Sequence, residues 1–391
     1  MSAPDPPLRI LHLVSSERWT GAAEPAATLA AEELRHGHQV EVACIGGHGF
    51  QQRLIEWGLP FIGGFFFDRR LGPSHLYKDI VRLRRYVLAR QPDIIHCHLP
   101  HDHWVASLAL RRPLSTLARQ GEPAIVRTMH RDAAPRHDLT HRWLAGKGSD
   151  MIIAVSLPQR QALIDVVGLP AYKIKWVRGS VDLERFHPGV SGEPVRTESR
   201  IPREALVAGM VARMQPNRGH HWMLDTIEEV FAHVPMAFYL LTGRGEIKEA
   251  LDQRIAAHRL GHHLRRIGYR WHDLVETYAA MDVFVMLAPG SDGTCRAMLE
   301  AMACGRAVIG ARRGAIGDTI EPGVSGWLVA PESRRELTQA LIEALGQPER
   351  TRAMGEAARA RVEQFHTRQA QYQSTLEVYQ EALARRAPAR V

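Results

Sequence analysis

The feature that most constrains the fold of this chain is a strand, loop, helix and strand in direct succession between residues 283 and 310. A short apolar run at 283–287 predicts a buried strand, and the sequence PGSDG that soon follows predicts a loop. An apolar stripe over 297–303 predicts a helix that ends at Gly305, a natural residue just beyond a helix. With the apolar run at 307–310, these pieces form a right-handed parallel crossover, whose loop lies where open α/β sheets bind ligands.

The same order of elements opens the chain. Residues 8–14 predict a strand, Gly21 begins a small-residue turn, 26–34 predict a helix, and 40–45 predict a second strand. Further strand-like runs lie at 59–67, 124–129, 150–156, 206–211 and 238–242. Two series of such units predict an α/β protein of two doubly wound domains. Residues 189–200, rich in Gly, Ser, Glu and Pro, predict a linker.

The composition is that of an ordinary globular protein. The chain has 391 residues, of which 45% are hydrophobic and 24% charged, enough for two domains. Its four cysteines form no disulfide framework, no signal peptide is visible, and no run is long enough to span a bilayer. These features predict a cytoplasmic protein with reduced thiols.

The net charge of +8 is compatible with nucleic acid, an anionic membrane surface or a phosphorylated substrate. Because no aromatic residues are interleaved with the basic ones, we expect no nucleic-acid partner. The most basic stretch is residues 78–90, KDIVRLRRYVLAR. As a helix, it would turn Ile80, Leu83, Val87 and Leu88 to one side and Lys78, Arg82, Arg85 and Arg90 to another. It could contact an anionic membrane, or simply cover a sheet with a solvated basic face.

Two carboxylates frame the loop and helix of the central unit: Asp292 in the loop and Glu300 on the helix. A helix N-terminus attracts phosphate through its N–H groups and dipole, and carboxylates accept hydrogen bonds from the hydroxyls of a sugar or ribose. A site with both features suits a ligand that contains sugar and phosphate. The alternative is that Glu300 is a solvated helix residue and Asp292 only a cap.

The segments DGTCRAMLEAMACGRAVI, RRGAIGDTI and PGVSGWLV follow one another between residues 292 and 329. In this order they resemble the signature of the retaining GT-B glycosyltransferases of family 4, also called group 1. Asp292 and Asp318 stand where that family usually has glutamate, which keeps the charge and shortens the reach. The resemblance implies a GT-B fold, with two Rossmann-like doubly wound domains facing a cleft. It implies an acceptor-side domain at 1–188, a donor domain at 201–366, and a C-terminal helix at 367–391 that packs back on the first domain.

The resemblance also implies a donor site in the second domain. Arg213 matches the arginine of the family pattern Gly-Arg-x-x-x-x-Lys-Gly, and Arg218 replaces its lysine, so both would hold the diphosphate. The N–H groups near Gly293 and Thr294 would add to this charge stabilisation. By the same resemblance, Glu300 would accept from the ribose, and Asp292 would hold hydroxyls of the transferred sugar.

Other family positions predict further contacts. Gly243 begins the G-x-G that follows a strand, and Tyr269 leads to the loop that would hold the base. In the first domain, the turn at Gly21 would face the donor phosphates or the acceptor, with Ala22 in place of a second glycine. His130, at a strand end, would contact the far side of the sugar, although a lone histidine there is more often structural.

A competing hypothesis comes from residues 96–103, HCHLPHDH, which resemble the metallo-β-lactamase signature His-x-His-x-Asp-His. Clustered histidines are common zinc ligands. However, extra residues break the spacing, and a D-x-x-H-x-H run at a strand end is frequent in this part of the glycosyltransferase family. A metal-dependent hydrolase is therefore the third hypothesis.

We predict a retaining glycosyltransferase that moves a sugar from a nucleotide diphosphate sugar, a UDP-sugar before GDP-mannose, to a hydroxyl of a glycan or lipid-linked acceptor. Because the chain has no Asp-x-Asp motif, we expect no metal and no cofactor. The second hypothesis is a non-catalytic protein that binds nucleotide sugars, because Ala22, Arg218, Asp292 and Asp318 depart from the usual residues. The charge preserved at the last three favours an enzyme.

Overall fold

The computed structural model describes residues 6–19, 21–68, 72–111, 122–131, 138–257, 260–270, 272–289 and 293–386, leaving out the side chain of Leu260. The chain forms two compact units. The first consists of Met1–Arg178 with Arg368–Val391, and the second of Gly179–Thr367. Each unit has its own parallel sheet, so the predicted α/β class with two Rossmann-like, doubly wound sheets is confirmed.

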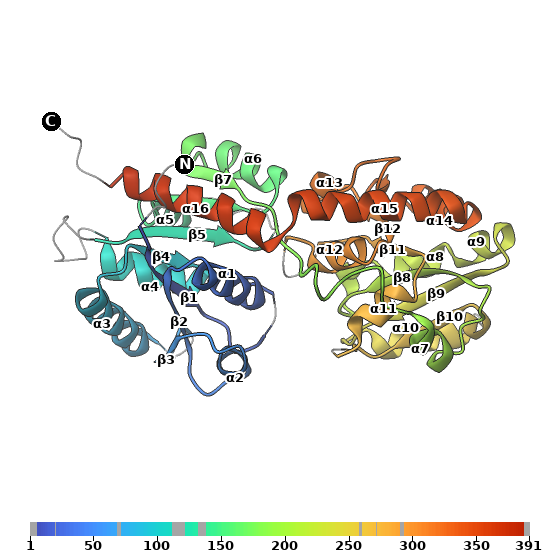
Figure 1. The fold of residues 1–391 in the computed structure, drawn as a ribbon, viewed down its shortest axis with the longest axis horizontal. Helices are drawn as coiled ribbons and strands as arrows, with labels where there is room; N and C mark the ends of the chain where they lie inside the picture. The colour runs from blue at the N-terminus through green and yellow to red at the C-terminus, as the bar shows by residue number, and fades with distance from the viewer. Residues whose placement is uncertain are drawn as a thin grey trace. The chain divides into compact units, whose positions relative to one another are not determined.

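The first unit is built on a seven-stranded parallel sheet in the order β3-β2-β1-β4-β5-β6-β7 (Figure 1). Its strands are β1 (Arg9–Val14), β2 (Gln39–Ile45), β3 (Phe61–Phe65), β4 (Ile94–Cys97), β5 (Ala124–Met129), β6 (Met151–Ala154) and β7 (Ile174–Trp176). The chain begins at β1, an interior strand, adds β2 and β3 on one side, and then returns to add the others on the other side. The loop after β1 therefore opens at the point where the strand order reverses.

Helices cover both faces of this sheet because successive side chains of a strand point to opposite faces. Leu11 and Leu13 of β1 pack in one core with α3 and α4, whereas Ile10 and Val14 pack in another with α1 and α16. The helices of this unit are α1 (Ala23–Arg35), α2 (Gly49–Glu56), α3 (Pro73–Arg90), α4 (Pro100–Leu110), α5 (Leu139–Gly146), α6 (Leu157–Asp165) and α16 (Arg368–Ala384). A 3-10 turn (η2, Ala171–Lys173) precedes β7.

The helix α16 comes from the end of the chain and lies along the first unit, in red in Figure 1. Its Val378 and Ala382 are buried in the core that α1 shares with the sheet. Its Tyr379 hydroxyl donates a hydrogen bond to Glu33 of α1 (2.9 Å), deep inside that core. This helix therefore completes one face of a sheet whose strands are far away in the sequence.

The second unit has a six-stranded parallel sheet in the order β10-β9-β8-β11-β12-β13. Its strands are β8 (Leu206–Val211), β9 (Ala237–Thr242), β10 (Leu264–Ile267), β11 (Val283–Met286), β12 (Ala307–Ala311) and β13 (Gly326–Val329). The strand order reverses between β8 and β11, which are paired although more than seventy residues separate Ala208 from its partner Val283. A ligand site is expected at the carboxyl ends of these two strands.

Two helical layers cover this second sheet. Its helices are α7 (Glu193–Glu198), α8 (His220–Asp225), α9 (Ile227–His233), α10 (Lys248–Ala257), α11 (Leu274–Ala279), α12 (Arg296–Ala303), α13 (Ala315–Thr319), α14 (Arg334–Gly346) and α15 (Pro348–Phe365), with 3-10 turns η3 (Pro216–Arg218) and η4 (Leu260–His262). One core gathers α7, α11, α12 and α13, and the other gathers α8, α9 and α14. No helix in the described parts of the chain is both long and apolar enough to cross a bilayer.

Two local predictions are wrong. The expected linker at 189–200 contains α7, whose Val195 is fully buried and whose Arg196 donates to Asp282 (2.9 Å). This segment is ordered as a helix because it packs in the core that also gathers α11, α12 and α13. On α3, Leu83 and Val87 are buried, but Leu88 is 62% exposed. One residue turns a helix by about 100°, so Leu88 leaves the side that Val87 covers.

A buried carboxylate, Asp102, joins three elements of the first unit. It accepts hydrogen bonds from the backbone N–H groups of Leu99 and Ser15, both at 3.0 Å, at the N-terminus of α4 and the end of β1. Its third neighbour is the guanidinium of Arg127 on β5, whose Nη1 lies 3.7 Å away. Asp102 is completely buried, so these contacts replace its hydration.

We expect Asp102→Ala to lower the free energy of unfolding by about 3 kcal/mol, because it leaves the buried guanidinium of Arg127 without its counter-charge. Urea unfolding would measure the loss. Asp138→Ala is the control, since Asp138 also caps a helix, α5, but is exposed and should cost much less. Equal losses in the two variants would contradict this role of Asp102.

Candidate functional site

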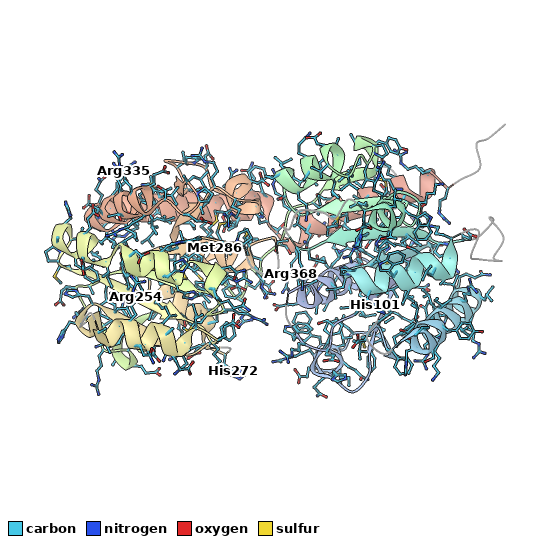
Figure 2. All side chains as sticks on the ribbon, turned by 180° about the vertical axis from the view of Figure 1, so that it is seen from behind. His101, Arg254, His272, Met286, Arg335 and Arg368 are labelled. Atoms are coloured by element: carbon cyan, nitrogen blue, oxygen red, sulfur yellow. The ribbon has the colours of Figure 1, made fainter. Side chains whose placement is uncertain are left out.

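The loop and helix that the sequence singled out follow β11, whose last residue, Met286, is labelled in Figure 2. The helix α12 starts at Arg296, and Gly305 follows it with a φ of 72°, as its predicted place after the helix requires. Asp292 lies outside the described residues, so its predicted role stays a prediction. Gly293 and Thr294, just before the helix, are both buried.

Cys295 precedes α12 in a left-handed conformation with a φ of 57°. This conformation is unfavourable for a residue with a side chain and is found preferentially at functional sites. Gly179 of another segment lies against the same turn, because a Cβ atom there would lie 2.4 Å from the Cβ of Thr294. Only glycine therefore fits where that segment passes the turn before α12.

Glu300 is a buried carboxylate on α12. It is 7% exposed and accepts a hydrogen bond of 2.6 Å from the hydroxyl of Tyr278 on α11. Burial and the adjacent charge of Glu300 hold the pKa of Tyr278 well above its usual value, so this hydroxyl stays a donor. Nε of Arg296 lies 3.5 Å from the other carboxylate oxygen. The alternative of a solvated Glu300 is therefore wrong.

The two predicted phosphate-binding arginines lie in the loop after β8, the strand beside β11. Arg213 is exposed, and Arg218 is half-buried and donates to the carbonyl of Pro289 in the loop after β11. Burial and the charge of Arg213 lower the pKa of Arg218. The structure thus brings two cations together at the strand-order reversal of this sheet.

Gly243 and Tyr269 follow the next two strands, β9 and β10. A Cβ on Gly243 would lie 2.0 Å from the carbonyl oxygen of Ala212, so only glycine fits beneath the loop after β8. Tyr269 packs against the core that contains α12. Because the carboxyl ends of parallel strands meet at one edge, Arg213, Gly243 and Tyr269 lie in loops along the same edge of the sheet.

The residues predicted in the first unit also lie at its carboxyl edge. Gly21 follows β1 with a φ of 56°, and Ala22 is buried at the start of α1. His130 follows β5, is 6% exposed, and bonds through Nε2 to Nδ1 of His98 (3.0 Å). Of the positions that depart from the family pattern, Asp318 lies in the second unit, on α13.

The histidines of the competing metal motif do not act as one set. His103 contacts the hydroxyl of Ser149 (2.8 Å), Asp102 holds backbone groups, and His101 lies on the first turn of α4 (Figure 2). His96 and His98 instead lie beside His12, and these form the one group of potential ligands found within the described ranges. The spacing of the motif in sequence therefore did not predict which side chains meet.

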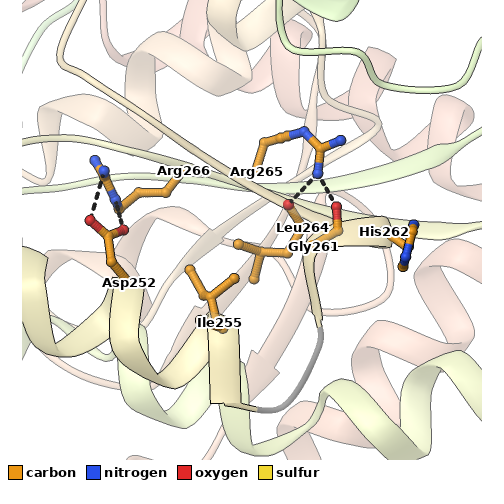
Figure 3. A pocket seen from close by; sticks show the side chains of 8 residues that line it. Asp252, Ile255, Gly261, His262, Leu264, Arg265 and Arg266 are labelled. Carbon is orange, nitrogen blue, oxygen red and sulfur yellow. Dashed lines mark hydrogen bonds and ion pairs between the residues drawn. The ribbon is translucent and has the colours of Figure 1, made fainter.

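A pocket of about 600 Å³ opens in the second unit (Figure 3). Its lining comes from α10, η4 and the edge strand β10, and includes Asp252 and Arg266, which pair with each other at 3.0 Å. None of the predicted site residues lines it. It is therefore separate from the edge described above.

Sequence reasoning missed Tyr278, Cys295 and Gly179. Tyr278 lies on α11, and nothing in the sequence around it indicates that its hydroxyl is the partner of Glu300. Gly179 stands in the run Arg178-Gly179-Ser180-Val181-Asp182, and its lack of a side chain is the one local signal for a close approach of another segment.

Two doubly wound units, each with loops gathered at the carboxyl edge of its parallel sheet, have the architecture of the GT-B class. Residues 193–361 match the model of "Glycosyl transferases group 1", and residues 19–185 match "Glycosyltransferase Family 4". The chain belongs to this family of GT-B glycosyltransferases, as its signature predicted.

Among curated relatives, a GDP-mannose-dependent monoacylated alpha-(1-6)-phosphatidylinositol monomannoside mannosyltransferase of Corynebacterium glutamicum is 31% identical over 192 residues, covering 47% of this chain and 50% of that protein. The match thus spans about half the length of that relative. A sulfoquinovosyl transferase of Arabidopsis thaliana is 28% identical, covering 83% of this chain and 66% of its own.

Solved structures agree on the fold. HepE of Anabaena in complex with UDP has a TM-score of 0.80 at 21% identity, covering 95% of this chain and 100% of that one. A glycosyltransferase from Rickettsia africae has a TM-score of 0.83 at 18% identity, covering 96% and 99%.

We expect Tyr278→Phe to weaken binding of UDP or GDP about tenfold, since a hydrogen bond to a charged group is worth about 1.5 kcal/mol and holds Glu300 in place. Calorimetry would measure the affinity. Tyr239→Phe is the matched control, because it removes another buried hydroxyl of the same unit, bonded to Thr226 at 2.9 Å. If both variants lost affinity equally, Glu300 would not depend on this bond in particular.

Proposed function

We propose that this chain is a retaining glycosyltransferase that uses a nucleotide diphosphate sugar. The observation that carries the proposal is the buried carboxylate of Glu300 on α12, held by Tyr278 of α11, on the helix that follows β11, the strand beside the one that leads to Arg213 and Arg218. A carboxylate suits ribose hydroxyls and paired arginines suit a diphosphate, so one ligand would satisfy both.

Each group has a role in the proposed reaction. Negative charge grows on the diphosphate as the bond to the sugar breaks, and Arg213, Arg218 and the N–H groups of Gly293 and Thr294 would stabilise it. The leaving phosphate oxygen would take the proton of the acceptor hydroxyl on the face from which it departs. The new bond from the acceptor oxygen to the anomeric carbon would then keep the configuration. Asp292 would hold hydroxyls of the sugar.

The sugar donor is inferred from the relatives. HepE was crystallised with UDP and with UDP-glucose, and the corynebacterial relative is named as GDP-mannose-dependent. We propose a UDP-sugar first and GDP-mannose second. Because two arginines supply the positive charge, we propose that the transfer needs no divalent metal and no cofactor.

Calorimetric titration with UDP, GDP and ADP in EDTA tests the site. We expect one of them to bind to the wild type, and Glu300→Ala to weaken it at least tenfold through loss of the ribose contacts. Glu336→Ala is a control on an exposed glutamate of α14 and should change nothing. If no nucleotide binds, with or without metal, the donor site is not functional.

Turnover separates the remaining hypotheses. NMR of the product formed from UDP-glucose or GDP-mannose would show whether the anomeric configuration is retained. Nucleotide binding without any transfer would favour a non-catalytic binding protein. Equimolar zinc in the purified protein would instead favour the metal-dependent hydrolase.

We propose a lipid-linked or surface glycan precursor as the acceptor, reached at an anionic membrane surface. On α3, the large apolar side chains of Tyr77 and Leu88 are 68% and 62% exposed. Lys78, Arg82 and Arg85 are exposed on the same helix. Exposed apolar side chains beside cations are typical of a helix that lies in a membrane interface. The corynebacterial relative is named for a phosphatidylinositol mannoside, which is itself a lipid.

We expect the protein to bind phosphatidylglycerol vesicles at low salt and the double variant Lys78→Glu/Arg85→Glu to bind more than tenfold less, because each basic side chain near such a surface is worth about 1 kcal/mol. Sedimentation with vesicles would measure this. Arg334→Glu/Arg335→Glu makes the same charge change on α14 (Arg335 is labelled in Figure 2) and should matter far less. Equal losses would show that only the net charge of the protein acts.

A further inference from the structure

Four buried side chains of the first unit form a continuous hydrogen-bonded chain. Oε2 of Glu33 lies 2.6 Å from Nε2 of His12, and Nδ1 of His12 lies 2.8 Å from Nε2 of His98. Nδ1 of His98 lies 3.0 Å from Nε2 of His130. None of the four residues is more than 6% exposed. This row of four side chains begins at the carboxylate of Glu33 and ends at the imidazole of His130, which is predicted to contact substrate.

The sheet topology brings the four residues of this row together from segments that are distant in the sequence. Glu33 lies on α1, His12 on β1, His98 just after β4, and His130 just after β5. β1, β4 and β5 are neighbours in the sheet. The imidazoles of His12 and His98 are stacked with centroids 5.1 Å apart, and those of His98 and His130 are 5.3 Å apart. The four groups therefore follow one row across the sheet toward its carboxyl edge.

One atom at the end of the row has no partner. Nδ1 of His130 is buried, yet it makes no hydrogen bond within the described part of the chain. Buried polar atoms without partners are rare and costly, and they need an explanation. A ligand that binds at this strand end would supply the missing partner.

A metal ion is the obvious alternative, because His12, His96 and His98 offer ligand atoms within 4.8 Å of one another. However, each of their six ring nitrogens already lies within hydrogen-bond distance of a side chain. His96 contacts the hydroxyls of Tyr379 (2.6 Å) and Thr128 (2.7 Å), and the contacts of His12 and His98 are given above. The donors and acceptors balance without an ion.

The direction of the protons follows from Glu33. An ionised carboxylate only accepts, and its other oxygen accepts from Tyr379. A neutral His12 must then carry its proton on Nε2, as in other carboxylate–imidazole pairs. Its Nδ1 is left as an acceptor, so His98 donates from Nε2, and His130 in turn donates from Nε2.

We propose that Glu33, His12 and His98 are positioning residues that fix the tautomer of His130, so that a bare Nδ1 accepts a hydrogen bond from a substrate hydroxyl. The identity of that hydroxyl as part of a sugar rests on the proposed function, whereas the tautomer does not. Burial lowers the pKa of His98 and His130, which keeps both rings neutral and the row intact. A donor hydroxyl at Nδ1 would be held in one orientation for the transfer.

The tautomer can be measured in the protein without any ligand. Long-range ¹H–¹⁵N correlation of histidine-labelled protein at pH 8 distinguishes the two tautomers, and the His130→Asn spectrum identifies the signals of His130. We expect Nε2–H on His130 in the wild type. In Glu33→Gln the amide can donate to His12 as well as accept, so a population with Nδ1–H on His130 should appear.

Tyr379→Phe is the matched control. It also removes a hydrogen bond from Glu33 in the same buried cluster, but it leaves the contact between Glu33 and His12 intact. The tautomer of His130 should stay as in the wild type. An unchanged tautomer in Glu33→Gln, an Nδ1–H on His130 in the wild type, or an equal change in Tyr379→Phe would each overturn the proposal. Equimolar zinc on the purified protein would do so as well.

A functional measurement separates this inference from the proposed function. In Glu33→Gln, binding of UDP and GDP should change little, because the groups predicted to hold the base, the ribose and the diphosphate with arginines belong to the second unit. Turnover with UDP-glucose or GDP-mannose should fall about tenfold, as is usual when a partner that orients a functional histidine is lost. If the wild type binds no nucleotide but shows the expected tautomers, the proposed function is wrong, whereas the proposed effect of the row on the tautomer of His130 is supported. If turnover is normal in Glu33→Gln, its role in transfer is excluded.

Discussion

The parallel pairing of β8 with β11 is the interaction on which the second unit depends. It joins two segments far apart in the chain and reverses the strand order between them. Because all strands point the same way, their carboxyl ends meet at one edge, and the loops after β8 and β11 open side by side there. Arg218 and Pro289 meet for this reason. The first unit obeys the same constraint, which brings the loops after β1, β4 and β5 to one edge.

Both units bury a glutamate where an unpaired carboxylate would be costly. In each case a tyrosine hydroxyl donates to it: Tyr278 to Glu300 (2.6 Å) and Tyr379 to Glu33 (2.9 Å). Burial and the neighbouring carboxylate raise the pKa of both tyrosines well above the usual value, so the hydroxyls stay protonated. A carboxylate held in this way keeps one orientation and can direct the groups that contact it.

The two units differ in the side chains that they place at the carboxyl edge of their sheets. In the second unit, arginines lie in loops at the edge itself, and their positive charge is available to a phosphate. In the first unit, the row from Glu33 to His130 contains no arginine or lysine, and we propose that it sets the tautomer of His130. In the proposed reaction a diphosphate would need such charge and a sugar hydroxyl would need an oriented acceptor.

The sequence by itself determined the α/β class, most of the strands, the strand ends that lead to Arg213, Arg218 and Gly243, and the helix that carries Glu300. It could do so because apolar periodicity and glycine position are local properties, and a strand end is an edge of the sheet in any parallel order. Only the tertiary structure decided that Tyr278 holds Glu300, that Leu88 faces solvent, and that residues 193–198 form a helix. The row of buried side chains that starts with Glu33 and His12 could not be predicted from the sequence either. These features depend on which strands become neighbours and which helix covers them, and pairing over such distances leaves no local pattern in the chain.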